Sequence, residues 1–371
     1  MKQINQFTIS CPLSTLHEDD PYLIGLGSLQ PLIVSNRHSP QILTFENGEW
    51  HTLVSFEKKS DNHFYEVSVS PYGIVVSQYI ELGENAKVEQ KTLLDLKTAA
   101  PILSQNEKSL NVYNWLEDQI SIGVDEQTNR WVCAALDGTI QWRTDIPNSG
   151  NMHLQIDKDY IYFWDYGIIS VFDRLGHVAG KYLAQHDIMA PRFFSVNMFL
   201  EDNTLYIEGL NKEANKYMRW KSTETNAVPV PQILFDLSAI SNIDRLEERD
   251  GNILLLSTQS GKNGVGTQCS LLCKKALTGP VPLFFVPEPG EEPWGGDIFW
   301  IDDTKFIYIQ AGDNSKVDMY TIDGKKICKG DNLPGQLWGD VFYASGLLYI
   351  PTRKFSNKAL EMKYYFTVFE L

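Results

Sequence analysis

Two carboxylates occupy matching places in a stretch of sequence that is written twice. Asp297 follows Trp294-Gly-Gly and Asp340 follows Trp338-Gly, and each begins an apolar strand that leads through a polar turn to a second strand ending in Tyr-Ile. Two carboxylates can bind a cation or a basic side chain, or can act as a general acid and base. The alternative is that each caps backbone N–H groups of the preceding turn and recurs because the structural unit recurs.

The tryptophans of these two stretches and one histidine complete the set of candidate site residues. Trp294 and Trp338 either pack between structural units or stay exposed as anchors for a partner. His153, at the start of another apolar strand, is the best placed of seven histidines, and no two histidines lie two or four residues apart. The spacing predicts no catalytic residue and no metal site, although separate strands could still bring ligands together.

Two glycine-rich stretches superficially resemble nucleotide-binding loops. Residues 261–266 (Gly-Lys-Asn-Gly-Val-Gly) lack the Gly-x-x-x-x-Gly-Lys-Ser/Thr pattern, and residues 25–27 (Gly-Leu-Gly) lack a third glycine. Neither is followed by a helical pattern whose N-terminus could hold a phosphate. We interpret both as loops between strands, and the sequence predicts no cofactor.

The charge of the chain limits its classes of partner. Its 371 residues include 32 Lys and Arg against 47 Asp and Glu, a formal net charge of −15. Nucleic acid is bound by Lys and Arg that neutralise phosphate, so we expect neither a nucleic-acid partner nor binding to an anionic membrane. A basic protein partner fits this charge, although an acidic balance also simply favours solubility.

The location follows from what the chain lacks. No stretch reaches the roughly 18–20 apolar residues of a membrane span, and residues 1–10 lack the apolar run of a secretory signal. If Met1 is the native start, the sequence predicts a cytoplasmic protein. We interpret the five cysteines as reduced thiols, because no Cys-x-x-Cys pair occurs among Cys11, Cys133, Cys269, Cys273 and Cys328.

The elements that carry these residues recur with a period of about 45 residues. Aligning the second strand of each hairpin places anchors at Tyr162, Tyr206, Leu255, Tyr308 and Tyr349, with spacings of 44, 49, 53 and 41. Looser copies occur around Val34, Val76 and Ser121. A period near 45 filled with short strands, and with almost no helical periodicity, is typical of the four-stranded blades of a β-propeller.

The sequence therefore predicts one all-β domain over residues 1–371, a β-propeller of eight four-stranded blades, with seven as the alternative. The predicted blades cover residues 20–58, 60–98, 108–147, 150–185, 192–236, 243–288, 294–330 and 337–371. The last blade is one strand short, and residues 1–10 contain an unpaired strand. We expect this N-terminal strand to pair with the last blade, which would close the ring and hide an exposed edge.

The outer hairpins suggest a family. Tight turns are predicted at Asn47-Gly48, Asp137-Gly138, Gly176 and Asp323-Gly324, because Asn-Gly and Asp-Gly accept positive φ. Residues 136–145 (Leu-Asp-Gly-Thr-Ile-Gln-Trp-Arg-Thr-Asp) resemble a repeat of PQQ-like, quinoprotein-type propellers. The resemblance implies that Trp142, and less clearly Trp50, lays its ring over a neighbouring blade. Because adjacent cysteines are absent, it implies a propeller of this repeat type without PQQ.

Two function hypotheses follow. The first is a non-enzymatic, monomeric scaffold that recognises a basic protein partner through one face and the mouth of the central channel, for example as an immunity-type inhibitor of a toxin. Trp294, Asp297, Trp338, Asp340 and His153 would line that mouth. The second is a hydrolase or lyase whose active site lies at the same mouth. A deep pocket with carboxylates of raised pKa would favour the enzyme, and a shallow acidic face would favour the scaffold.

Overall fold

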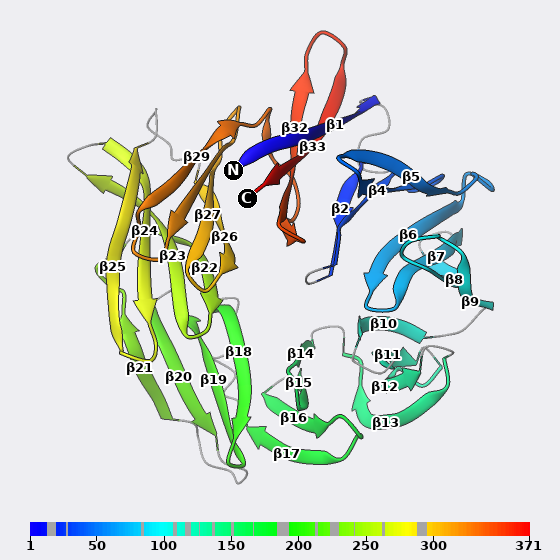
Figure 1. The fold of residues 1–371 in the computed structure, drawn as a ribbon. Coiled ribbons are helices and arrows are strands. Elements are labelled where there is room, and N and C mark those ends of the chain that lie inside the picture. Colours follow the sequence, from blue (N-terminus) through cyan, green and yellow to red (C-terminus); the bar gives the residue numbers. More distant parts are fainter. Residues whose placement is uncertain are drawn as a thin grey trace.

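Eight small antiparallel sheets are arranged around a ring in the computed structural model of the chain (Figure 1). The structure describes residues 1–12, 20–26, 29–82, 85–106, 110–115, 120–125, 127–135, 138–149, 152–165, 167–183, 193–211, 214–222, 230–240, 242–261, 264–287 and 295–371. Every regular element in these ranges is a strand, and no helix there is long and apolar enough to cross a membrane.

Blades 1 to 4 follow one another along the first half of the chain. Blade 1 contains β2 (Tyr22–Ile24), β3 (Leu32–Ser35), β4 (Gln41–Glu46) and β5 (Glu49–Ser55). Blade 2 contains β6 (His63–Ser70), β7 (Gly73–Leu82), β8 (Asn85–Leu94) and β9 (Pro101–Asn106). Blade 3 contains β10 (Leu110–Trp115), β11 (Ile120–Asp125), β12 (Arg130–Ala135) and β13 (Ile140–Pro147). Blade 4 contains β14 (His153–Ile156), β15 (Tyr160–Asp165), β16 (Ile168–Asp173) and β17 (Val178–Leu183).

Blades 5 to 8 complete the ring. Blade 5 contains β18 (Phe193–Glu201), β19 (Thr204–Asn211), β20 (Lys216–Ser222) and β21 (Val230–Asp236). Blade 6 contains β22 (Ile243–Arg249), β23 (Asn252–Gly261), β24 (Gly264–Cys273) and β25 (Thr278–Pro287). Blade 7 contains β26 (Gly296–Asp302), β27 (Lys305–Gln310), β28 (Lys316–Thr321) and β29 (Lys326–Asn332). Blade 8 contains β30 (Gln336–Leu337), β31 (Phe342–Ala344), β32 (Leu347–Ser356), β33 (Glu361–Glu370) and β1 (Lys2–Pro12).

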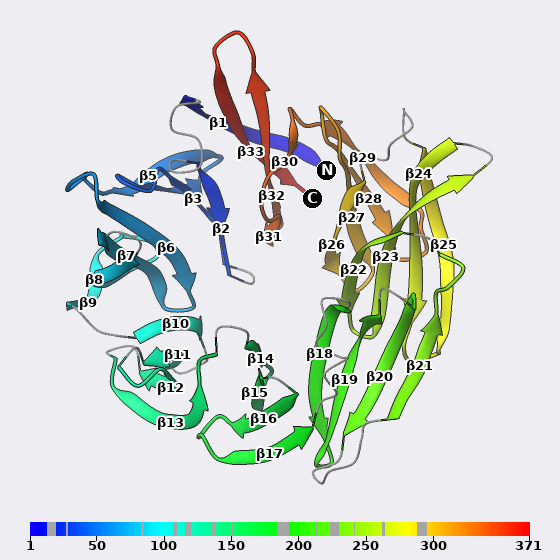
Figure 2. The same cartoon turned by 180° about the vertical axis from the view of Figure 1, so that it is seen from behind.

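Blade 8 is built from both ends of the chain. β1 pairs antiparallel with β33 from Lys2↔Glu370 to Pro12↔Glu361. The two ends of the chain accordingly lie close together in both views of the ring (Figures 1 and 2). The predicted eight-bladed propeller and its closure by the N-terminal strand are confirmed, and the seven-bladed alternative is wrong. The closing strand is slightly longer than predicted, because it continues from Ser10 to Pro12.

Blade 2 ends later than the sequence predicts. Its outer strand β9 lies beyond residue 98, the predicted end of the blade. The turn before β9 contains no Asn-Gly or Asp-Gly pair. Instead, the Asp95 carboxylate accepts hydrogen bonds from the backbone N–H groups of Lys97 and Thr98. From the sequence alone, a turn of this kind within a blade looks the same as a loop between two blades, so the end of blade 2 was predicted too early.

The middle strands of the blades are apolar along their whole length because both faces of each sheet are covered. In β23, Ile253 and Leu255 pack against blade 5, whereas Leu254 and Leu256 pack against blade 7. This two-residue alternation sends successive side chains to opposite neighbours. Among the described residues, a buried apolar cluster fills seven of the eight contacts between blades, all except that between blades 2 and 3.

A buried network of charges adds to the apolar contact between blades 5 and 6. The Glu208 side chain on β19 is fully buried and binds Arg219 on β20 and Lys274 after β24. Lys274 also binds Glu248 on β22, whose carboxylate accepts the hydroxyl of Tyr217 at 3.0 Å. Burial and the neighbouring carboxylates raise the pKa of Tyr217, so the phenol stays protonated as a donor.

Trp142 joins blade 3 to blade 4 as the family resemblance implies. Its ring stacks on Phe172 with 6.0 Å between centroids, and its indole N–H donates to the carbonyl of Arg174 at 3.3 Å. At Gly176 (φ +84°) a Cβ atom would come within 2.6 Å of the indole, so only glycine allows this close contact. Trp50 similarly contacts another blade, because its ring lies 6.0 Å from that of Tyr349 in blade 8.

Replacing Trp142 tests this contact between blades. We expect Trp142→Ala to lower the free energy of unfolding by about 2 kcal/mol, less than the ~3–5 kcal/mol of a fully buried tryptophan, because the ring is only half-buried. Denaturant unfolding followed by circular dichroism measures the change. Leu175→Ala is the control, because Leu175 is 73 % exposed in the turn that Trp142 contacts. Equal effects of the two substitutions would contradict the docking role of Trp142.

Candidate functional site

The repeated Trp-Gly stretch has a backbone reason. Gly295 (φ +70°) and Gly339 (φ +82°) both lie in the left-handed region before the candidate carboxylates, where other residues are strained. Trp294 lies outside the described residues. The repeat therefore marks a turn that leads the chain into the innermost strand of blades 7 and 8.

Asp297 lies at the start of β26, on the innermost edge of blade 7. Its Oδ1 is 3.1 Å from Nε of Arg245 in β22 of blade 6, and its side chain is 24 % exposed. Burial raises the pKa of Asp297, and the nearby carboxylate of Asp340 raises it further, while Arg245 opposes both effects. Asp297 therefore lies between a cation from the preceding blade and an anion from the following one.

Three residues of β22, which the sequence did not identify, belong to the same site. The register of β22 shifts between Ile243 and Arg245, so Asp244 forms a β-bulge, and its carboxylate accepts the Thr258 hydroxyl at 2.8 Å. Nη2 of Arg245 binds Oε1 of Glu247 at 3.0 Å. Burial raises the pKa of Glu247, as does the charge of Asp297, although Arg245 opposes the shift. A single guanidinium thus binds two carboxylates from neighbouring blades.

Asp340 is placed differently from the prediction, because it does not begin a continuous inner strand. β30 pairs with β32 at Leu337↔Thr352, and β31 resumes the pairing at Phe342↔Tyr349. The inner side advances five residues, from Leu337 to Phe342, while the partner strand advances only three, from Thr352 to Tyr349. The segment that contains Gly339 and Asp340 therefore has two extra residues. This irregularity interrupts the inner strand and leaves Asp340 exposed to solvent.

A pocket of about 390 Å³ opens between blades 7 and 8 next to these carboxylates. Gly296, Asp297, Gly312, Gln336 and Gly339 contribute to its lining. A Cβ atom at Gly296 would lie 2.5 Å from the Tyr308 ring, which explains the second glycine before Asp297. We call Asp244, Arg245, Glu247, Asp297 and Asp340 the acidic mouth. It combines four carboxylates with one guanidinium, which binds Glu247 and Asp297.

The other two described candidates lie apart from the acidic mouth. Trp338 packs between blades 8 and 1, where its N–H donates to the Pro21 carbonyl at 3.4 Å and the Arg353 guanidinium lies 3.6 Å from its ring centroid. These contacts correspond to the packing alternative. His153 begins the inner strand of blade 4, three blades from blade 7. It is exposed, yet the surrounding protein lowers its pKa by desolvation, which favours a neutral imidazole.

The described residues hold no group of three or more histidine, cysteine, aspartate or glutamate side chains arranged for a metal ion. This agrees with the geometry of the acidic mouth, where Arg245 already occupies the place between Asp297 and Glu247. What the arrangement can do chemically is to bind a positive group, because its negative charge exceeds the charge of its own arginine.

The influence of Asp340 on Asp297 can be measured. We expect Asp340→Asn to lower the pKa of Asp297 towards 3.8, because one repulsive charge is removed. The raised pKa means that the folded chain holds this proton more tightly than the unfolded chain. Stability therefore falls as pH rises from 3.8 to the folded pKa, and Asp340→Asn makes this fall smaller. Carboxyl-detected NMR titration measures the pKa. Asp145→Asn, on the outer strand of blade 3, is the control and should leave it unchanged.

The chain was compared with family models, curated sequences and solved structures, and one solved structure supports the fold. No family model and no curated protein sequence matches the chain. A crystal structure of a eukaryotic initiation factor is 8 % identical, with a TM-score of 0.50 over 88 % of this chain and 90 % of that one. Hsv2 of Kluyveromyces lactis with one loop replaced is 11 % identical, with a TM-score of 0.42 over 79 % and 93 % of the two chains. Virginiamycin B lyase from Staphylococcus aureus is 10 % identical, with a TM-score of 0.39 over 97 % and 99 %. At 8 % identity, the likeness to the initiation factor supports a shared fold and leaves function open.

Proposed function

We propose that the protein is a binding scaffold whose acidic mouth receives a basic segment of a partner protein. The observation that carries this proposal is Asp340, an exposed carboxylate in the interrupted inner strand, whose negative charge repels that of Asp297. A lysine or arginine of a partner would remove the repulsion between these two carboxylates on binding. The partner thus supplies positive charge, which balances the carboxylates that Arg245 alone does not neutralise.

The charge of the whole chain supports the same class of partner. A formal net charge of −15 attracts a basic protein over distances of about a Debye length and speeds its association. An immunity-type inhibitor of a basic toxin is one form that such a scaffold could take. We propose that the scaffold acts as a monomer and binds no cofactor.

A short cationic peptide tests the proposal without a known partner. We expect acetyl-tetra-arginine amide to bind the full chain in isothermal titration calorimetry at low salt, and Asp340→Asn with Asp297→Asn to weaken binding at least tenfold. The control, Asp145→Asn with Asp303→Asn, removes two charges outside the acidic mouth, where both side chains are more than half exposed. Equal weakening by both double variants would mean that only the net charge matters and would overturn the site.

A hydrolase or lyase is the second candidate function, and the raised pKa values of Asp297 and Glu247 favour it. A carboxylic acid that keeps its proton closer to neutral pH can act as a general acid. Both carboxylates, however, are bound by Arg245, which also holds them in place as ion-pair partners. An activity that Asp297→Asn abolishes while the peptide still binds would favour the enzyme over the scaffold.

Two finer assignments belong to the same proposal. We propose that the chain is a PQQ-like repeat propeller without a PQQ site, supported by the way Trp142 packs on blade 4. We also propose a cytoplasmic location, supported by five cysteines that all remain free thiols. Burial raises the pKa of Cys133 to about 12, so this thiol stays protonated and unreactive.

A further inference from the structure

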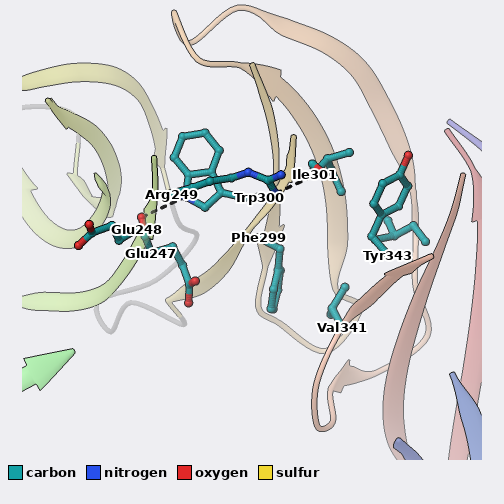
Figure 3. A pocket seen from close by; sticks show the side chains of 9 residues that line it. Glu247, Glu248, Arg249, Phe299, Trp300, Ile301, Val341 and Tyr343 are labelled. Atoms are coloured by element: carbon teal, nitrogen blue, oxygen red, sulfur yellow. Dashed lines mark hydrogen bonds between the residues drawn. The ribbon is translucent and has the colours of Figure 1, made fainter. Parts of the chain in front are cut away.

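A second pocket, of about 300 Å³, lies on the inner strands of blades 6, 7 and 8 (Figure 3). It is lined by Glu247, Glu248, Arg249, Phe299, Trp300, Ile301, Val341, Tyr343 and Leu348. We call it the aromatic pocket. The pocket beside Asp297 shares none of these lining residues, because it is formed at the Gly296 end of β26 and the aromatic pocket at the Trp300 end. Glu247 of the acidic mouth does line the aromatic pocket, so the two sites adjoin.

The interrupted inner strand of blade 8 explains why there is space here. Phe299 and Ile301 point from β26 towards blade 8, where they join the cluster that includes Leu348. The strand that would cover Phe299 is broken between β30 and β31, and Val341 lies in this break. Figure 3 shows Phe299 and Val341 facing each other, with Tyr343 further along the same side. Part of the apolar surface of blade 7 is therefore left open towards the channel.

The charged residues of the aromatic pocket are already paired within the chain. Glu247 binds Arg245 at 3.0 Å, Glu248 binds Lys274, and Nε of Arg249 binds Asp303 at 2.8 Å. In Figure 3 the Glu248 carboxylate points away from Phe299 and Val341. An isolated ion entering the pocket would compete with these partners and lose its own hydration. The open surface of the pocket thus contains both polar and apolar atoms, and its apolar lining includes Phe299, Val341 and Tyr343.

Aromatic groups suit this apolar lining best. The Phe299 ring and the Tyr343 ring, whose residue is 37 % exposed, can each meet another ring in a stacked or edge-on contact. The volume lies at the lower end of the range of about 300–1,000 Å³ for ligand pockets, which suits one side chain rather than a large cofactor. The Trp300 N–H donates to the Glu247 carbonyl at 3.1 Å. This hydrogen bond holds the indole in one orientation, so this part of the pocket lining is preorganised for a ligand.

We propose that the aromatic pocket binds a large aromatic side chain of the same partner protein whose basic segment binds the acidic mouth. The inference rests on the proposed function in naming a protein as the source of the ring. Asp297 and Trp300 are three residues apart on β26, about 10 Å along the strand, and Glu247 contributes to both sites, so one partner can reach both. A partner would then be held by a buried aromatic anchor as well as by charge.

Ligand-observed NMR tests the aromatic pocket directly. N-acetyl-tyrosinamide is expected to bind the full chain with a Kd in the millimolar range, and N-acetyl-argininamide is expected not to compete with it. Val341→Trp fills the pocket and should weaken binding of the tyrosinamide at least tenfold. Ile233→Trp, at a residue 47 % exposed on the outer strand of blade 5, is the matched control and should change nothing. Thermal unfolding verifies that both variants are folded.

Tyr343→Leu separates this proposal from the proposed function better than a change at Phe299, whose ring centroid lies 5.7 Å from Cζ of Arg245 in the acidic mouth. It removes a ring but keeps an apolar side chain, so it should weaken tyrosinamide binding and leave tetra-arginine binding unchanged. Asp340→Asn should do the reverse. Tyrosinamide binding that survives Val341→Trp, or displacement by the argininamide, would overturn the aromatic pocket. If the tyrosinamide binds as expected and the tetra-arginine peptide does not, the pocket stands as a site for a free aromatic molecule, and the partner's ring is rejected as its ligand.

Discussion

A chain that lacks residues 2–12 is expected to lose cooperative folding and to aggregate. β1 forms the outer edge of blade 8, where it pairs with the full length of β33. Its side chains Ile4, Phe7, Ile9 and Cys11 pack on the cluster between blades 8 and 1. At ~1.5–3 kcal/mol for each fully buried apolar side chain, the loss is on the order of 5 kcal/mol even for partial burial. That is comparable with the whole stability of many domains, about 5–15 kcal/mol.

Size-exclusion chromatography and thermal unfolding measure this effect. Thr8→Ala is the control, because Thr8 is an exposed residue of the same strand and its replacement keeps the pairing. A truncated chain that elutes and unfolds like the full chain would contradict the closure.

A disulfide gives a second test that does not depend on a truncated chain. Ser10 lies opposite Lys363 in the pairing of β1 with β33, so Ser10→Cys with Lys363→Cys should cross-link under oxidation. Lys354 lies opposite Lys363 on the far side of β33, so Ser10→Cys with Lys354→Cys should remain open, since two strand spacings of about 4.8 Å separate them. The reverse result would show a different strand order in blade 8.

Glu208→Gln is expected to lower the free energy of unfolding by about 3–5 kcal/mol. The substitution keeps the size of the side chain but removes the charge that binds Arg219 and Lys274 between blades 5 and 6. Removing one partner of a buried ion pair leaves the other charges uncompensated in a poorly solvated place. Lys274 is only 13 % exposed, so water cannot replace the lost carboxylate.

Denaturant unfolding with Asp145→Asn as the control isolates the contribution of burial. Asp145 binds Arg130 at 2.7 Å, but its side chain is fully exposed, and surface pairs contribute only about 0–1 kcal/mol. A similar small effect of Glu208→Gln would mean that water reaches the network, in contradiction to its burial.

The repeat was predictable because it depends on neighbours along the chain. The turns at Asn47-Gly48 and Asp323-Gly324 connect β4 to β5 and β28 to β29, as their backbone preferences predict. The unpaired N-terminal strand and the incomplete last blade together indicated closure. Blade 2 was the exception, because the turn at Asp95 relies on side-chain hydrogen bonds that are common in any loop.

The candidate site was less predictable because it depends on neighbours around the ring. Asp297 meets Arg245, more than 50 residues earlier, only because blade 6 adjoins blade 7. The bulge at Asp244 and the break beside Asp340 are shifts in strand register, and a period of 45 residues conceals shifts of one or two. One signal in the sequence could have indicated the site. The first strand of blade 6, unlike the first strands of the other modules, carries charged residues of both signs, among them Arg245 and Glu247.

The salt dependence of peptide binding tests the acidic mouth most directly. Calorimetric titration of acetyl-tetra-arginine amide into the full chain at 20 mM and 200 mM NaCl should give a Kd that rises at least tenfold, because salt screens attraction between exposed charges. The Asp297→Asn, Asp340→Asn double variant should show weak binding at low salt and a smaller rise. No binding at 20 mM, or a Kd that is the same at both concentrations, would contradict recognition of a basic partner at this site.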